Sequence, residues 1–145
     1  YRDRRQRQMC IRDRSKLENI DNPNINPIDD AFSLECDVFS PCALGAIFNE
    51  SSIKSLNCKI IAGGANNQLQ DLSIANALHN RDIIYIPDIL INSGGAIGLT
   101  KDLMKRNEVE TESDLMNIAY RVREALTESQ EKSINLQDTI RELII

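Results

Sequence analysis

Three short segments of small and polar residues could bind a ligand: residues 41–43 (Pro-Cys-Ala), 63–67 (Gly-Gly-Ala-Asn-Asn) and 92–95 (Asn-Ser-Gly-Gly). Each follows an apolar run. Asparagine amides both donate and accept hydrogen bonds, which suits a carboxamide, a ribose hydroxyl or a carboxylate. Open α/β sheets bind ligands at the carboxyl ends of their parallel strands. We therefore expect the three segments to converge on one crevice, where Asn66 and Asn67 face the ligand.

The same residue types also occur in plain turns, so a structural interpretation stands beside the functional one. Asn-Asn and Gly-Gly pairs after strands are common turn chemistry. Cys42 could be a nucleophile, but a small buried thiol at a helix start is the simpler interpretation. His79 is the only histidine, and it is most simply an exposed helix residue. A single histidine in a helix argues against a nucleophilic triad.

Three apolar runs, at residues 34–40, 58–62 and 83–86, predict the strands that position these segments. Proline cannot donate to a central ladder, so Pro41 and Pro87 mark the ends of the first and third strands. Continuous apolar runs are typical of parallel strands. Strands that alternate with helices predict an α/β fold. Three strands make a thin sheet, so we expect the second half of a doubly wound (Rossmann-like) parallel sheet followed by a helical C-terminal tail.

Two helices are predicted between these strands. Residues 42–48 carry apolar and small side chains at a spacing that suits a helix packed closely on the sheet. That helix is expected to fade over residues 49–52, where polar side chains compete for backbone hydrogen bonds. Residues 68–80 supply the apolar face of the second helix.

The chain beyond the third strand is predicted to be first extended and then helical. Residues 88–92 are expected to form an extended loop, and Gly94 and Gly95 to give the backbone freedom near another group. The pattern is helical from Ala96 onward, and residues 111–114 (Thr-Glu-Ser-Asp) predict a helix start.

Charge and composition exclude several classes of function. The net charge is −5, and residues 1–14 carry six Arg against two Asp, so the rest of the chain has a charge of −9. Such an acidic body repels nucleic-acid phosphates. We find no run of about 18 apolar residues and no secretory signal, and expect no membrane partner and a cytoplasmic location. The cysteines form no C-x-x-C pair, so no metal site is expected; they are Cys10, Cys36, Cys42 and Cys58.

The chain is expected to have three parts. Residues 1–14 could be a basic arm for phosphates, but they resemble translated sequencing-adapter read-through, and we interpret them as a non-native or disordered arm. Residues 15–33 are rich in Asn, Asp and Pro and predict a loop-rich lead-in. Residues 34–145 form the folded domain with its C-terminal helices.

Residues 35–46 (ECDVFSPCALGA), 61–69 (IAGGANNQL) and 85–95 (YIPDILINSGG) closely resemble the glutamate/leucine/phenylalanine/valine dehydrogenase family, and the leucine dehydrogenase branch in particular. The three motifs have the family's order and spacing. The resemblance implies a partial NAD-binding domain at 34–145. It also implies reversible oxidative deamination of an L-amino acid to a 2-oxo acid and ammonia, with NAD as the hydride acceptor.

The resemblance also implies roles for individual residues. Cys42, Ala43 and Asn66 would line the nicotinamide end of the cofactor, and Asn67 would hold the substrate carboxylate. Ala96 and Leu99 would lie beside the substrate side chain. An apolar pair there favours an aliphatic, branched-chain substrate.

The family's catalytic lysines, glycine-rich phosphate turn and acidic ribose reader have no counterpart in this sequence. We therefore assign no catalytic residue. We expect a C-terminal fragment of an enzyme whose full-length parent is a homo-oligomer, and that the fragment is inactive alone. The rival hypothesis is a small α/β protein that binds nucleotides or partners without catalysis.

Overall fold

The computed structural model describes residues 28–144. The chain divides into two units, residues 1–31 and 32–145, and nearly all of the described residues belong to the second. The predicted arm at residues 1–14 and most of the predicted lead-in lie outside the described residues. The lead-in ends in a short 3-10 helix, η1 (Ile28–Ser33).

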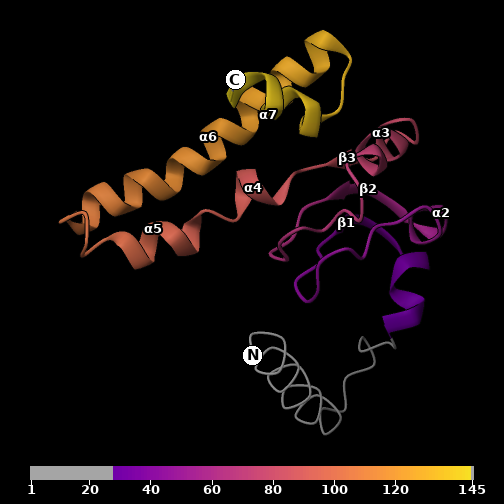
Figure 1. Ribbon diagram of the computed structural model, residues 1–145, viewed down its shortest axis with the longest axis horizontal. Helices are drawn as coiled ribbons and strands as arrows, with labels where there is room; N and C mark the ends of the chain where they lie inside the picture. Colours follow the sequence, from indigo (N-terminus) through magenta and orange to yellow (C-terminus); the bar gives the residue numbers. More distant parts are fainter. Residues whose placement is uncertain (1–27, 145) are drawn as a thin grey trace, which may run out of the picture. The chain divides into compact units, whose positions relative to one another are not determined.

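Three parallel strands form the sheet: β1 (Glu35–Phe39), β2 (Asn57–Ile61) and β3 (Ile84–Tyr85), in the order β1-β2-β3 (Figure 1). The register aligns Phe39 with Ile61 and Ile61 with Tyr85 across the sheet. The predicted α/β fold with three parallel strands is confirmed. Since all three strands run the same way, their carboxyl ends lie at one edge of the sheet.

The described residues form six α-helices, of which α2 follows β1, α3 follows β2 and the other four follow β3. They are α2 (Ser52–Ser55), α3 (Ser73–His79), α4 (Asp88–Ile91), α5 (Gly94–Thr100), α6 (Glu108–Lys132) and α7 (Leu136–Ile144). The helical C-terminal tail is confirmed. None of the helices within residues 28–144 is long and apolar enough to cross a membrane.

Phe48 lies at the centre of the main core. Its side chain is fully buried, and its ring makes edge contacts with Phe32, Phe39 and Tyr85, with centroids 6.0–6.4 Å apart. The buried residues of this core are Phe48, Ile53, Leu56, Ile61, Ile74, Leu78, Ile83 and Tyr85. A second, smaller cluster joins α6 to α7 through Ala125, Leu136 and Ile140.

The prediction of a helix at residues 42–48 is wrong, because these residues do not form a helix. These residues run beside the segment that follows β2: the Ala46 N–H donates to the Asn67 carbonyl at 2.7 Å, and the Phe48 N–H to the Gln68 carbonyl at 3.1 Å. Ala46 also has a left-handed backbone, with φ of 54°. Inter-segment hydrogen bonds therefore replace helical ones, and the first helix, α2, begins where the predicted one was expected to fade.

The segment after β2 also differs from its prediction. Helix α3 begins at Ser73, because residues 68–70 pair with the β1 side through a parallel bridge between Phe48 and Leu69. The backbone N–H of Gln70 donates to the Phe48 carbonyl at 2.9 Å. The predicted helix at 68–80 is thus correct only in its second half.

The extended loop predicted at residues 88–92 is wrong, because α4 occupies Asp88–Ile91. Pro87 precedes it with φ of −59° and ψ of 139°, and the Asn92 N–H closes the turn onto the Asp88 carbonyl at 2.8 Å. Gly94 and Gly95 begin α5 and do not have positive φ. The freedom expected of these two glycines is therefore not used.

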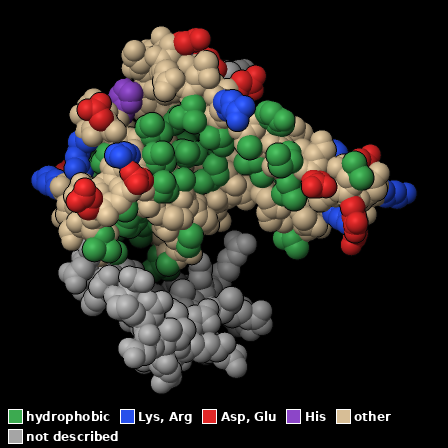
Figure 2. All heavy atoms as spheres, turned by 180° about the vertical axis from the view of Figure 1, so that it is seen from behind, with side chains coloured by type: hydrophobic (Ala, Val, Ile, Leu, Met, Phe, Trp, Pro, Cys, Tyr) green, Lys and Arg blue, Asp and Glu red, His purple; other side chains and the backbone are tan. Residues whose placement is uncertain are grey.

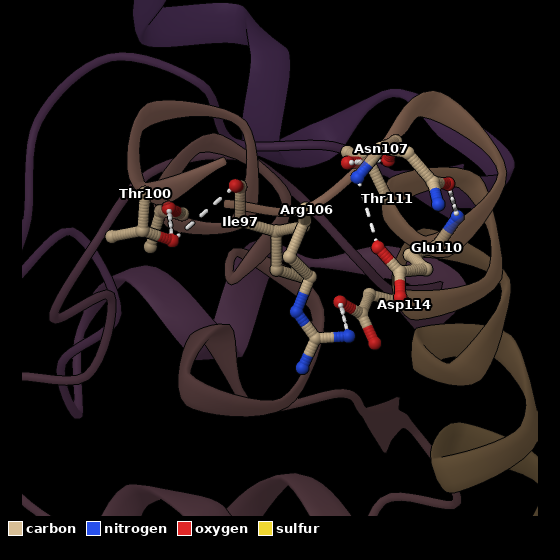
Figure 3. Close-up of polar contacts among 8 residues, drawn as sticks. Ile97, Thr100, Arg106, Asn107, Glu110, Thr111 and Asp114 are labelled. Carbon is tan, nitrogen blue, oxygen red and sulfur yellow. Dashed lines mark hydrogen bonds and ion pairs between the residues drawn. The ribbon is translucent and has the colours of Figure 1, made fainter. Parts of the chain in front are cut away.

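Helix α6 begins at Glu108, three residues before the predicted start at Thr111. Asn107 and Glu110 form a capping box: the Asn107 side chain accepts from the Glu110 N–H, and the Glu110 carboxylate accepts from the Asn107 N–H, both at 2.9 Å (Figure 3). An ion pair between Arg106 and Asp114 at 2.9 Å spans the first two turns of the helix. A capping box satisfies two otherwise unpaired backbone donors, which explains the earlier start.

Candidate functional site

The segments after β1 and β2 stay hydrogen-bonded beyond the ends of the strands. The Ala62 N–H donates to the Phe39 carbonyl at 3.1 Å, and the Ala65 N–H donates to the Pro41 carbonyl at 2.8 Å. Residues 41–48 and 62–70 therefore form one continuous edge, which carries Cys42 and Ala43 on one segment and Asn66 and Asn67 on the other.

Glycine is required where these segments approach most closely. A Cβ at Gly63 would clash with the backbone and ring of Pro41. One at Gly45 would lie 2.7 Å from the Asn66 carbonyl oxygen. Gly64 is different, because its position is exposed and a Cβ there would meet only the Cys42 Sγ at 3.8 Å.

Gln68 holds the loop after β2 from inside. Its side chain is fully buried, and its Nε2 donates to the carbonyl oxygens of Gly63 at 2.8 Å and Ala65 at 2.7 Å. Its Oε1 has no hydrogen-bond partner among the described residues. This role of Gln68 was not predicted from the sequence. The one available signal was a glutamine directly after the asparagine pair, where a polar side chain can satisfy the carbonyls of a tight loop.

Asp88 and Asn92 join the β3 end to the β2 end. The Asn67 N–H donates to Asp88 Oδ2 at 2.8 Å, which supports the left-handed conformation of Asn67, with φ of 52°. Asn92 Nδ2 donates to the Ala65 carbonyl at 3.1 Å and to Asn66 Oδ1 at 3.2 Å. The Asn66 side-chain oxygen accepts this hydrogen bond from Asn92, so the Asn66 amide nitrogen is on the side turned away from Asn92.

Two ionisable groups near the strand ends have shifted pKa values. Burial, together with the nearby Asp88 carboxylate, raises the pKa of Tyr85, so its phenol stays protonated. The backbone N–H of Gly64 and the Ser40 hydroxyl, 3.6 Å from Cys42 Sγ, lower the pKa of the Cys42 thiol. Cys42 is exposed and lies in a loop, so the interpretation of a buried thiol at a helix start is wrong.

Four of the six predicted site residues lie together at the strand ends, and two do not. Cys42, Ala43, Asn66 and Asn67 are exposed on the two paired segments. Ala96 and Leu99 lie on α5, which packs against α6, and Leu99 is 88% exposed. No hydrogen bond found in residues 28–144 ties α5 side chains to the strand ends, although Asn92 lies just before this helix. His79 is exposed at the end of α3, as predicted.

A cavity of about 440 Å³ is lined by β3, α3 and the tail helices, and its lining does not include Cys42, Ala43, Asn66 or Asn67. Residues from Ala75 to Tyr85 line one side and residues from Leu126 to Gln137 the other. The described part of the chain holds no group of three His, Cys, Asp or Glu side chains that could bind a metal ion. The candidate chemistry therefore rests on the amides and small residues at the strand ends.

The family model described as Glutamate/Leucine/Phenylalanine/Valine dehydrogenase matches residues 3–139. The chain belongs to this dehydrogenase family. It is 46% identical over 79 residues to leucine dehydrogenase of Thermoactinomyces intermedius, a stretch that covers 54% of this chain and 22% of that protein. It is 39% identical over 106 residues to leucine dehydrogenase of Bacillus subtilis (strain 168), with 73% of this chain and 29% of the relative covered.

A solved amino acid dehydrogenase has a similar structure. The crystal structure of L-tryptophan dehydrogenase from Nostoc punctiforme matches with a TM-score of 0.76 at 34% sequence identity, and the match covers 79% of this chain and 35% of that chain. By comparison, the chain spans less than a third of the length of each of the two leucine dehydrogenases. These relatives differ in the amino acid that their names specify.

Proposed function

We propose that this chain is the nicotinamide-binding half of the cofactor domain of an NAD-dependent amino acid dehydrogenase. The reaction is the reversible oxidative deamination of an aliphatic, branched-chain L-amino acid to a 2-oxo acid and ammonia. The observation that carries the proposal is the hydrogen-bonded edge formed by the three strand ends, in a chain of this family. That edge presents Asn66 and Asn67 beside the small residues Cys42 and Ala43.

The residues at this edge fit a nicotinamide nucleotide. The amide nitrogen of Asn66 can donate to a carboxamide oxygen or a ribose hydroxyl, because its oxygen already accepts from Asn92. Ala43 and Gly64 are exposed and small, so a planar ring could approach the backbone there. When bound, the nicotinamide would supply the acceptor for hydride from the substrate α-carbon. In this proposal Cys42, Ala43 and Asn66 hold and orient that ring.

Asn67 is proposed to bind the substrate carboxylate. Its backbone is fixed by Asp88 and by the Ala46 N–H, so its exposed side chain starts from a defined position. Pre-organisation of this kind lowers the entropic cost of binding. Ala96 and Leu99 are proposed to contact the substrate side chain. An apolar pocket distinguishes aliphatic substrates by only about 1–3 kcal/mol per methylene, so neighbouring branched-chain amino acids should all be used.

The groups that transfer protons are proposed to lie outside this chain. Three of its lysines are already paired with carboxylates away from the strand ends: Lys59 with Asp37, Lys101 with Glu108, and Lys132 with Glu128 and Glu142. The chain matches less than a third of the length of the two leucine dehydrogenases. This is consistent with an active site that other segments of the protein complete. We therefore assign binding and orienting roles here, and expect no turnover by the 145-residue chain alone.

A chimera tests the proposal. The matching 106-residue segment of Bacillus subtilis leucine dehydrogenase is replaced by the corresponding segment of this chain, and NAD reduction is followed spectrophotometrically with leucine, valine and phenylalanine. We expect turnover with leucine and valine. The controls are the parent enzyme and the isolated chain, which should be active and inactive respectively. A chimera that folds like its parent but oxidises none of these amino acids would favour the non-catalytic binding protein instead.

A further inference from the structure

Cys36 and Cys58 are direct register partners on the neighbouring parallel strands β1 and β2. Paired residues in a parallel ladder project from the same side of the sheet, so the two thiols share one face. Both side chains are half-buried and both thiols are free. The register therefore places two free thiols at neighbouring positions of β1 and β2.

The spacing of the strands brings these cysteines within reach of a covalent bond. Neighbouring strands lie about 4.8 Å apart, and disulfides join Cα atoms that are about 4.4–6.8 Å apart. The pKa of Cys58 is consistent with this proximity, because it is raised first by burial and then by the charge that Cys36 would carry. Cys42, in its exposed loop, has no such partner in the register, and Cys10 lies outside the described residues.

We propose that Cys36 and Cys58 form a redox-sensitive thiol pair, which closes into a disulfide between β1 and β2 when the chain meets a small-molecule disulfide. This inference is independent of the dehydrogenase function. It follows from strand register and from the chemistry of the two thiols alone.

The exchange with an oxidant of the glutathione disulfide class is balanced. The Cys36 thiolate attacks one sulfur of the small disulfide, forms a mixed disulfide and releases one small thiol. The Cys58 thiolate then attacks the Cys36 sulfur and displaces the second small thiol. The two protons that leave the cysteines end on the two released thiols, and the small disulfide is reduced as the cysteine pair is oxidised. The raised pKa of Cys58 assigns it the second step.

The bond would be strained and therefore reversible. Cβ atoms in disulfides are usually about 3.8 Å apart, so closure draws the strands together by about 1 Å. Strained disulfides are more easily reduced and are typical of regulatory rather than structural bonds. β1 leads directly into Ser40 and Cys42, so closure would act on the strand that carries one side of the candidate cofactor edge.

Disulfide mapping of the full chain tests the proposal without a variant. The reduced protein is treated with excess glutathione disulfide, free thiols are blocked with N-ethylmaleimide, and the product is digested with trypsin and Asp-N together. This digestion places every cysteine in a separate peptide: residues 8–12, 30–36, 37–54 and 55–59. We expect peptide 30–36 linked to peptide 55–59, and expect dithiothreitol to release both.

Matched variants control for the other thiols. The link should persist in Cys42→Ser and Cys10→Ser, and disappear in Cys36→Ala and Cys58→Ala, with circular dichroism used to verify that each variant is folded. Two results would overturn the proposal. One is that peptides 30–36 and 55–59 are both recovered as maleimide adducts after oxidation; the other is that the dominant link includes Cys10 or Cys42.

Discussion

The strand ends and the α5–α6 hairpin differ in how they are held. At the strand ends, buried groups such as Gln68, together with Asp88 and Asn92, tie three segments to one another. Helix α5 has no buried residue. Apolar side chains along the hairpin are 76–88% exposed: Leu99 on α5, Leu103 in the connecting turn and Val109 on α6. Figure 2 shows hydrophobic side chains gathered on the surface of one face of the molecule.

This difference divides the proposed site. Asn66 and Asn67, assigned to the cofactor and the carboxylate, lie where the chain itself determines their position. Ala96 and Leu99, assigned to substrate selection, lie on a helix whose contacts within the described residues are mainly with α6. Under the proposed roles, the residues that bind the cofactor and the carboxylate are held firmly at the strand ends, whereas the residues that select the substrate side chain lie on a helix held mainly by α6.

The largest contrast is expected between Phe48→Ala and Leu99→Ala. Phe48 is fully buried among three aromatic rings, and loss of such a side chain lowers the free energy of unfolding by about 3–5 kcal/mol. Leu99 is 88% exposed, so its truncation should change stability by less than about 0.5 kcal/mol. Urea unfolding followed by circular dichroism measures both. Equal losses would show that α5 is as well packed as the core.

A matched pair of glycine substitutions gives the next largest contrast. Alanine at Gly63 would clash with Pro41, and overpacking at such a position costs about 3 kcal/mol. Alanine at Gly98, which has nothing within 4 Å of its added Cβ and lies within α5, should instead stabilise the chain by about 0.5–1 kcal/mol. The same urea titration applies. A neutral Gly63→Ala variant would contradict the close approach of the β1 and β2 ends.

A smaller effect is expected when the capping box at the start of α6 is removed. Replacing Asn107 with Ala removes the side-chain acceptor for the Glu110 N–H, which costs about 1 kcal/mol. Asn117→Ala, an exposed substitution in the middle of α6, is the control and should be neutral or slightly stabilising. Helix content during thermal unfolding is the measurement. Identical curves for the two variants would mean that α6 does not depend on this cap.

The smallest expected effect is a difference in thiol labelling between Cys42, which follows the end of β1, and Cys58, which lies inside β2. The pKa of Cys42 is lowered by the Gly64 N–H and the Ser40 hydroxyl, whereas burial raises that of Cys58. Because the thiolate is the reactive form, iodoacetamide should label Cys42 at a lower pH and Cys58 only at a higher one. In urea the two should react alike. A Cys58 that is labelled before Cys42 in the folded chain would contradict the described loop.

The sequence predicted the sheet better than the segments around it. Apolar runs ending at Pro41, Gly63 and Pro87 located all three strands, because strand ends have strong local signals. Residues 42–48 failed because their apolar spacing suits a helix, whereas hydrogen bonds to residues 67–68 decide the conformation. Such contacts join residues about twenty positions apart, and local patterns do not record them. Gln68 was missed for a different reason: its hydrogen bonds to Gly63 and Ala65 are local, but the burial of its side chain is set by packing that the sequence pattern does not record.

The most direct test of the account is a comparison of Asn67→Ala with Asn66→Ala in the active chimera. If Asn67 binds the carboxylate and Asn66 the cofactor, Asn67→Ala should raise the KM for leucine by about tenfold or more and leave that for NAD nearly unchanged. Asn66→Ala should raise chiefly the KM for NAD. The reverse pattern would exchange the two assignments. Unchanged KM values for both substrates in both variants would contradict the claim that the strand ends form the binding site.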